Sequence, residues 1–376
     1  MKKTQKRITA LIFMLIVILL PFITLVSKKE NFSELENRVL SKKPEFSLEN
    51  WFDKSFMNDF ESYVSDHFSG REKWITKKID IELMTGKKEI NGVYITDDRL
   101  IEKIPEPDND CIKRSVDTIN NFAKSVKTPV YVLIAPTSAG IYSESLGKHA
   151  PQLDQKEIIS GIYSGFNTNV LPINVYEALY ARKDEYIYYR TDHHWTSLGA
   201  YNAYNVAIQK MGFIAVAYSE YNIEHANDEF LGTYHSKTLY DKLLPDIIDI
   251  YSYTGGNSVV SCEVNNGMET QQYNSIYFRD FLEKKDKYST YLGSNQPAVT
   301  IRTNLESDKK LLVFKDSYAN SFIPFLTQHY KEITVLDMRY IANYKDYADP
   351  EEYSQILFLY NSTTFCSDNN IKKIMY

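Results

Sequence analysis

The chain has 376 residues, which suits two average domains or one large α/β domain with additions. Its 43% hydrophobic and 24% charged residues are close to globular averages and exclude a disordered, collagen-like or coiled-coil chain. The first seven residues carry four cations and no acid, and with these set aside the net charge of −6 becomes −10. Because binding to phosphates needs a basic surface, this charge argues against a nucleic-acid partner.

An uncharged run of nineteen residues, from Ile8 to Val26, follows the basic head. At about 1.5 Å per residue, a helix of this length reaches about 28 Å, which is enough to cross a membrane. The run is longer than the apolar part of a typical signal peptide, and no small-residue cleavage site follows it. We therefore expect residues 1–29 to form a cytoplasmic head and an uncleaved signal anchor, with a single pass and the rest of the chain on the extracytoplasmic side. Secretion after signal cleavage is the alternative.

Residues 30–110 are expected to form a stem and an N-terminal elaboration of the main domain. Phe52, Phe56 and Phe60 fall at helical spacing after a polar, irregular stretch and predict a lead-in helix. Short β-prone runs follow and are separated by a turn at Asn91-Gly92.

Residues 111–376 alternate helical patterns with short apolar runs, which is typical of an α/β domain. The pattern predicts an open, mostly parallel sheet with helices on both faces. Residues 213–300 contain many Asn and Tyr and are expected to form an irregular insertion or cap. One predicted helix begins after Pro107 and carries an apolar face from Val116 to Val126, and two more cover 196–211 and 319–328. The predicted strands cover 129–136, 310–314, 332–336 and 355–360.

Three cysteines, Cys111, Cys262 and Cys366, lie far apart and show no CxxC or metal-binding spacing. This spacing excludes a disulfide scaffold. One disulfide and three buried thiols remain as the two interpretations.

Ser317 is predicted to lie at the carboxyl end of a buried strand and at the start of a helix. Ligands bind at this edge of open α/β sheets, and a helix start offers backbone N–H groups to a developing oxyanion. The position therefore suits a serine nucleophile. A helix cap is the simpler interpretation, since serine at a helix start most often caps it.

The segment Asp192-His193-His194-Trp195 offers the other groups that a serine nucleophile needs. A serine hydroxyl needs an imidazole to take its proton, and the imidazole needs a carboxylate to orient it. In an extended segment Asp192 and His194 point to the same side, so His193 is expected to face away. Two alternatives remain: a capping aspartate with two partly exposed histidines, or a metal site that adds a distant histidine such as His235.

Asp192-His193-His194-Trp195 is the signature of the DHHW protein family, which this chain resembles over nearly all of residues 30–376. The family is similar to the SGNH-hydrolase-like domains of the alginate O-acetylation proteins. This resemblance implies that residues 111–376 form an SGNH-like catalytic domain in which Asp192 orients the base, His194 is the base and Ser317 is the nucleophile. The other segments that resemble the family are Glu36-Asn37-Arg38, Tyr63-x-x-Asp66-His67-Phe68-x-x-Arg71, Asn91-Gly92-Val93-Tyr94 and Lys315-Asp316-Ser317-Tyr318-Ala319-Asn320.

Further residues near the predicted strand ends are candidates for contacts with a substrate. Lys315 stands where the related proteins usually have glycine, so the turn before Ser317 must accommodate a side chain. This departure from the family pattern affects the oxyanion geometry more than the triad. The backbone N–H of Ser317 is the expected first oxyanion donor. Each of the other candidates could instead have an ordinary role in a turn, in an ion pair or in the core. The candidates are the oxyanion donors Thr137, Asn320 and Asn361, the anion contact Arg339 and the sugar-stacking Trp195 with Tyr188 and Tyr189.

The resemblance implies an extracytoplasmic serine O-acetyltransferase that acts on a cell-surface or secreted polysaccharide. An acetyl group would pass through an acyl-enzyme on Ser317 to a sugar hydroxyl, without a cofactor or a metal. Because acetyl-CoA is absent outside the cell, the resemblance also implies a membrane-bound acyltransferase partner that supplies acetyl groups. The alternatives are a glycan acetyl esterase with the same triad, or a non-catalytic carbohydrate-binding or assembly protein on the same scaffold.

Overall fold

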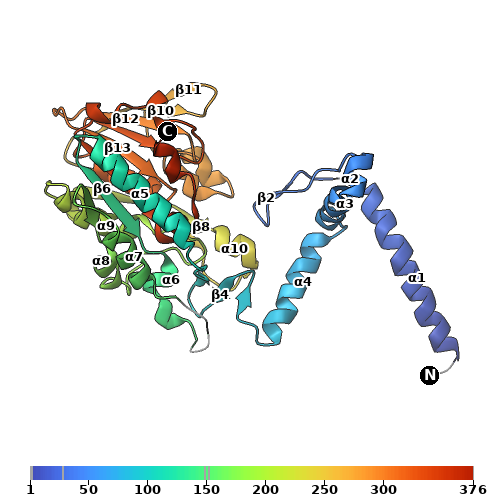
Figure 1. The fold of residues 1–376 in the computed structure, drawn as a ribbon. Helices are drawn as coiled ribbons and strands as arrows, with labels where there is room; N and C mark the ends of the chain where they lie inside the picture. Colours follow the sequence, from blue (N-terminus) through green and yellow to red (C-terminus); the bar gives the residue numbers. More distant parts are fainter. Residues whose placement is uncertain (1–2, 28, 148–149, 151–152, 376) are drawn as a thin grey trace. The chain divides into compact units, whose positions relative to one another are not determined.

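The computed structural model describes residues 3–27, 29–147, 150 and 153–375, and Figure 1 labels its elements. Its contacts divide the chain into two compact units. One consists of Met1–Ile90 with Ser236–Leu239, and the other of Asn91–His235 with Tyr240–Tyr376. This division falls earlier in the chain than residue 110, because the antiparallel strands β4 (Val93–Ile95) and β5 (Leu100–Glu102) group with the second unit.

The first unit is largely helical. Helix α1 (Lys3–Val26) contains the apolar run, and its residues Gln5–Thr24 are long and apolar enough to cross a membrane. The predicted lead-in helix is two helices, α2 (Leu48–Phe52) and α3 (Ser55–Asp66), because Lys54 adopts a left-handed backbone with φ of 68°. The remaining elements are β1 (Phe32–Ser33), β2 (Arg38–Val39), α4 (Arg71–Met84) and β3 (Glu89–Ile90).

An eight-stranded sheet forms the centre of the second unit. In order across the sheet, the strands are β11 (Thr270–Tyr273), β10 (Val259–Asn265), β12 (Ala298–Thr303), β14 (Glu332–Leu336), β13 (Lys310–Lys315), β15 (Gln355–Asn361), β6 (Val130–Ala135) and β7 (Val170–Ile173). The strands from β14 to β7 pair in parallel, and β12, β10 and β11 add antiparallel pairs at one edge. The expected open, mostly parallel sheet is therefore confirmed.

Helices cover both faces of this sheet, which explains why its parallel strands are continuous apolar runs. The helices are α5 (Asn109–Ser125), α6 (Ser138–Ile141), α7 (Gln155–Ser164), α8 (Tyr176–Tyr180), α9 (Ser197–Lys210), α11 (Ala319–Leu326) and α12 (Ser362–Ser367). A further short helix is α10 (Thr233–Thr238). The connections from β13 to β14 and from β6 to β7 cross the sheet in opposite directions, so right-handed crossovers place α11 and α7 on opposite faces. Helix α5 crosses in front of the sheet in Figure 1, and its Phe122 packs edge-on against Phe314 and Phe358.

Residues 213–300 are more regular than the sequence predicts, so the expected irregular insertion is corrected. Strands β8 (Tyr221–Phe230) and β9 (Asp246–Tyr253) form an antiparallel pair, and β10 and β11 continue the main sheet. Buried and half-buried residues alternate at the start of β9, as in a strand with one covered face. The alternation is hard to see in the sequence because polar residues such as Asp246 occupy buried positions.

Candidate active site

Three side chains from two distant segments meet at the carboxyl edge of the central sheet. Ser317 lies in the turn between β13 and α11, and His194 lies in the bent segment before α9. The Nε2 atom of His194 is 2.8 Å from Ser317 Oγ, and its Nδ1 atom is 2.6 Å from Asp192 Oδ1. The structure thus brings a hydroxyl, an imidazole and a carboxylate into one hydrogen-bonded series, which is the arrangement used for acyl transfer.

Both carboxylate oxygens of Asp192 are held by donors. The Oδ1 atom accepts a hydrogen bond from His194 N at 3.0 Å, and the Oδ2 atom accepts from Thr233 N at 2.8 Å and from Thr233 Oγ1 at 3.0 Å. A Cβ atom at Gly232 would lie 2.3 Å from Asp192 Cβ, so only glycine allows this approach. Gly232 and Thr233 support the carboxylate, and no local sequence pattern marks either of them.

A second buried aspartate fixes the chain just before Asp192. Asp246, in β9, accepts hydrogen bonds from Arg190 N at 2.7 Å, from Thr191 N at 2.8 Å and from the Tyr186 hydroxyl at 2.6 Å. Burial raises the pKa of Asp246, although these donors counteract the rise. The residue was missed in the sequence because it belongs to the segment that was expected to be irregular.

Tyr288 connects the imidazole with the serine. It belongs to the 3-10 helix Lys287–Thr290, and its ring stacks on His194 with 3.6 Å between centroids. Its hydroxyl donates to Ser317 O at 2.9 Å and lies 3.2 Å from Ser321 Oγ. A single tyrosine therefore restrains both the imidazole and the backbone of Ser317.

Trp195 joins the two segments, and the predicted stacking on a sugar is corrected. The indole is fully buried, and its Nε1 atom donates to Tyr318 O at 3.0 Å. In return, the Tyr318 hydroxyl donates to His193 O. Tyr188 and Tyr189 are also fully buried, so all three rings pack in the core, where a sugar cannot reach them.

His193 does not face away from the site, so this prediction is also corrected. The segment bends at this point instead of running extended, and the rings of His193 and His194 lie 3.7 Å apart. The Nδ1 atom of His193 is 2.7 Å from Thr233 Oγ1. His193 and Ser317 line the same cavity.

Burial and nearby charges set the protonation of the imidazole and the carboxylate. Burial, and after it the charge of His193, lowers the pKa of His194 below its ordinary value. Burial alone would raise the pKa of Asp192, but His193 and His194 hold it well below its ordinary value. At neutral pH the imidazole is therefore neutral and the carboxylate is ionised, so His194 can accept the proton of Ser317.

A cavity of about 180 Å³ opens beside Ser317. Ser317 follows β13, Thr137 follows β6 and Asn361 ends β15, and these three neighbouring parallel strands bring the residues to one edge. The walls are mainly polar. The other lining residues are Glu102, Lys103, Ile104, His193, Tyr234, Tyr318, Arg339, Thr363 and Thr364.

The structure distinguishes two of the candidate oxyanion donors, Asn361 and Thr137. Both protons of Asn361 Nδ2 are used, on Asp316 Oδ2 at 2.7 Å and on Thr364 Oγ1 at 2.8 Å. The predicted donation from this side chain to a substrate is therefore corrected. Thr137 Oγ1 accepts a hydrogen bond from Gln155 Nε2 at 3.0 Å. Its role as the second donor stays a prediction.

The remaining two candidates lie around the buried carboxylate of Asp337. Lys315 Nζ is 3.6 Å from Asp337 and donates to Asn320 Oδ1 at 2.9 Å, and burial lowers the pKa of this ammonium group. Asn320 is not among the described residues that line the cavity, and its predicted oxyanion role stays a prediction. Arg339 lines the cavity and also binds Asp337 through two N–H groups, at 2.9 and 2.6 Å. The ion pair predicted for Arg339 is present, and its contact with an anionic substrate stays a prediction.

The metal-site alternative finds partial geometric support. One ligand atom each from Asp192, His193 and His194 lie within 4.8 Å of one another. Both ring nitrogens of His194 already belong to the hydrogen-bonded series, so a metal would have to displace Asp192 or Ser317 from them. His235, the distant histidine considered in the sequence, lies 2.7 Å from Asp241 instead.

The sequence model of the DHHW protein family matches residues 92–336, a stretch that includes Asp192, His194 and Ser317. The chain belongs to the DHHW protein family. A solved DHHW family protein from Eubacterium siraeum is 27% identical over 76% of this chain and 95% of its own, with a TM-score of 0.67. These two matches carry the family assignment.

Two further solved structures resemble this DHHW protein. Bacillus cereus PatB1 with a sulfonyl adduct is 22% identical over 74% of this chain and 97% of its own, with a TM-score of 0.64. The O-acetyltransferase domain of Pseudomonas putida AlgJ is 14% identical over 74% of this chain and 93% of its own, with a TM-score of 0.48. No curated protein matches the chain. The expected α/β fold, with an open and mostly parallel sheet, is shared with the Eubacterium siraeum protein and with PatB1.

Proposed function

We propose that this DHHW protein is a serine-dependent O-acetyltransferase that modifies a cell-surface or secreted polysaccharide through an acyl-enzyme on Ser317. The main support is the hydrogen-bonded series from Ser317 through His194 to Asp192, which opens onto a polar cavity of about 180 Å³. The motif resemblance to the alginate O-acetylation proteins supports acetyl as the group and a polysaccharide as the acceptor. The PatB1 structure, with its sulfonyl adduct, indicates that the fold can present a reactive nucleophile.

The first half of the reaction forms the acyl-enzyme. Ser317 Oγ attacks the carbonyl carbon of the acetyl donor while its proton moves to His194 Nε2. The backbone N–H of Ser317 is the first donor to the resulting oxyanion, and the Thr137 hydroxyl is the second. The bond to the leaving oxygen then breaks, and His194 returns the proton to that oxygen.

The second half transfers the acetyl group to the acceptor. A sugar hydroxyl gives its proton to His194 Nε2, and its oxygen attacks the acetyl carbon on Ser317. When the intermediate collapses, the Ser317 oxygen leaves and regains the proton from His194. Asp192 stays ionised throughout and stabilises the imidazolium that forms in each half.

The site works outside the cytoplasmic membrane in this proposal, with α1 as the anchor. The four cations before the apolar run support a cytoplasmic N-terminus by the positive-inside rule. Acetyl groups reach the site from a membrane-bound acyltransferase partner, because acetyl-CoA stays inside the cell.

The test is the mass of the intact full-length protein after incubation with an activated acetyl ester. We expect one added acetyl group on the wild type, none on Ser317→Ala and slower addition on His194→Ala. Ser164→Ala, at an exposed serine on α7, is the matched control and should behave as the wild type. No adduct on a folded protein would overturn the proposal and favour the carbohydrate-binding alternative. Adding an oligosaccharide distinguishes an O-acetyltransferase from an acetyl esterase with the same triad. A transferase acetylates the sugar faster than it releases acetate, and an esterase releases acetate.

A further inference from the structure

Helices α2 and α3 carry large apolar side chains although neither helix contains a buried residue. Phe46, Trp51 and Phe60 are 61%, 49% and 44% exposed. The rings touch one another, with Phe46 and Phe56 at 5.3 Å and Phe56 and Phe60 at 5.9 Å between centroids. A connected exposed patch of this kind marks an interaction surface. We call it the aromatic face and define it as Phe46, Trp51, Phe56, Met57, Phe60 and Val64.

The part of the aromatic face that belongs to α3 is one side of an amphipathic helix. At about 100° per residue, Phe56, Phe60 and Val64 share one side of α3, and its acids Asp59 and Glu61 fall outside that side. Residues 48–66 contain one lysine against five acids, so positive charge does not draw this segment to anionic groups. The partner that this surface fits is therefore apolar.

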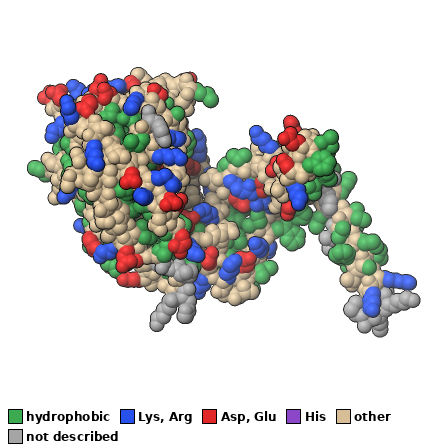
Figure 2. Space-filling view, viewed as in Figure 1, with side chains coloured by type: hydrophobic (Ala, Val, Ile, Leu, Met, Phe, Trp, Pro, Cys, Tyr) green, Lys and Arg blue, Asp and Glu red, His purple; other side chains and the backbone are tan. Residues whose placement is uncertain are grey.

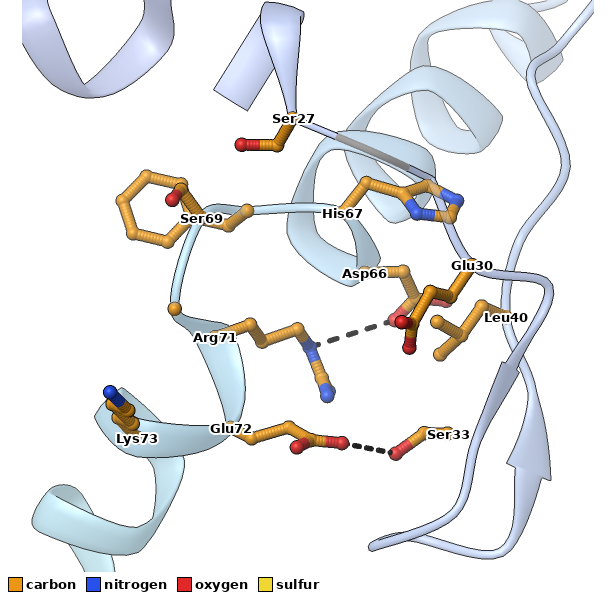
Figure 3. A pocket seen from close by; sticks show the side chains of 12 residues that line it. Ser27, Glu30, Ser33, Leu40, Asp66, His67, Ser69, Arg71, Glu72 and Lys73 are labelled. Carbon is orange, nitrogen blue, oxygen red and sulfur yellow. Dashed lines mark hydrogen bonds and ion pairs between the residues drawn. The ribbon is translucent and has the colours of Figure 1, made fainter. Parts of the chain in front are cut away.

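The structure fixes the turn between α3 and α4 at the C-terminal end of α1. Ser69 N donates to Thr24 Oγ1 at 3.2 Å, and Thr24 is buried there. A cavity of about 260 Å³ lies between Ser27, which follows α1, and the turn that contains His67 and Ser69 (Figure 3). In Figure 2 hydrophobic side chains cover much of α1 and gather on the neighbouring helix pair. The aromatic face thus lies close to the point where α1 would leave a membrane.

Two ion pairs hold this arrangement, and they explain two of the family segments. Arg38 binds both oxygens of Asp66, with its Nη1 at 3.0 Å and its Nη2 at 2.5 Å, and this pairing holds the pKa of Asp66 well below its ordinary value. Arg71 binds both oxygens of Glu36. Glu36-Asn37-Arg38 and the segment from Asp66 to Arg71 are therefore the two sides of one contact, which ties the chain after α1 to the end of α3.

We propose that the aromatic face lies in the headgroup region of the membrane that α1 crosses, and that the Arg38–Asp66 and Arg71–Glu36 pairs hold it there. The proposal rests on the membrane anchor of the proposed function. Aromatic side chains favour this region, and an amphipathic helix lies in its plane with the apolar side toward the acyl chains. The stem would then leave the membrane in a fixed direction.

The test compares nitroxide labels on two neighbouring positions of α3 in the full-length protein, reconstituted in vesicles of phosphatidylcholine and phosphatidylglycerol. The variants are Phe60→Cys, on the aromatic face, and the matched control Glu61→Cys, outside it. The three native cysteines are buried, so the label goes to the new thiol. We expect the label at position 60 to be more accessible to oxygen, which concentrates in lipid, and less accessible to a water-soluble nickel chelate than the label at 61.

Equal access of nickel to both labels would overturn the proposal, as would shielding of position 60 from both reagents, since the latter means that protein covers the face. Flotation of the protein with the vesicles reports the anchor separately, so loss of the anchor and failure of the proposal give different results. Arg38→Gln in the Phe60→Cys protein should raise nickel access while flotation stays unchanged.

A second measurement leaves the aromatic face unaltered. In the Trp74→Phe variant, the remaining tryptophans are Trp51 on the face and the fully buried Trp195. Brominated lipids should quench Trp51, and the quenching should be absent when Trp51→Phe is added. Unquenched Trp51 fluorescence in a protein that floats with the vesicles would contradict the proposal.

Discussion

The ring of Tyr288 lies flat on the imidazole of His194, with 3.6 Å between centroids and 7° between the ring planes. The same tyrosine donates its hydroxyl hydrogen to Ser317 O at 2.9 Å. Tyr288 therefore sets the position of the proposed base relative to the proposed nucleophile. Tyr288 comes from the segment between β11 and β12. The candidate site therefore depends on this segment as well as on the carboxyl edge of the central sheet, where Ser317 lies.

Replacing Tyr288 should slow acyl transfer without removing the nucleophile. We expect Tyr288→Leu to lower kcat/KM for an acetyl ester about tenfold, because an aromatic contact of about 1 kcal/mol and a hydrogen bond are lost together. Tyr288→Phe keeps the ring and removes only the hydroxyl, so its kcat/KM should fall less than that of Tyr288→Leu. Steady-state kinetics with both variants check this order, and the loss should appear in kcat more than in KM. Equal activity of the leucine variant and the wild type would remove the positioning role.

The pH dependence should report the charge of His193. Burial and then this charge lower the pKa of His194, so the rate should stay high below pH 6.5 and fall only when His194 becomes protonated at lower pH. Removing a neighbouring cation makes protonation of His194 easier, which raises its pKa. His193→Gln should therefore move the acid limb of kcat/KM to higher pH. The control is His225→Gln, at an exposed histidine paired with Asp249, which should leave the profile in place. An acid limb that does not move in His193→Gln would argue against this coupling.

The regular elements could be predicted because their signals are local. The helix expected over 196–211 is α9, where Thr196 Oγ1 accepts from Gly199 N at 3.2 Å and Gly212 follows the end with φ of 88°. The strand expected over 310–314 is β13, and the observed strand extends one residue further, to Lys315. Capping residues, apolar periodicity and glycine each act within a few residues of the boundary that they set.

The residues that support the candidate site could not be predicted in this way. Gly232, Thr233, Asp246 and Tyr288 reach Asp192 or its neighbours only after the chain folds, and each is a single residue without a periodic pattern. The orientation of His193 was predicted wrongly for a related reason. The hydrogen bond from His194 N to Asp192 Oδ1 closes a tight turn, which replaces the extended backbone on which the prediction depended.

Gly232 should tolerate no side chain. A Cβ atom there would lie 2.3 Å from Asp192 Cβ and 2.5 Å from its Oδ2 atom, so Gly232→Ala must move the carboxylate or the chain that carries Thr233. We expect this variant to lose about 1–3 kcal/mol of unfolding free energy and to lose activity as well. The control is Gly161→Ala on α7, where a new Cβ meets nothing within 4 Å and the helix should gain stability. Denaturant unfolding and ester turnover measure both effects. A Gly232→Ala protein with native stability and activity would contradict the packing described here.

The three cysteines should remain unreactive in the folded protein. The structure answers the question left by the sequence, since Cys111, Cys262 and Cys366 are all free and buried. Burial raises the pKa of Cys262 and of Cys366 to about 12, and it also raises the pKa of Cys111, so few thiolates form at neutral pH. Iodoacetamide should therefore add nothing to the native protein and three groups after denaturation, as read by intact mass. Ser164→Cys, which places a thiol on an exposed position of α7, should take up one group in the native state. Uptake of a single group after denaturation of the wild type would reveal a disulfide and contradict the structure.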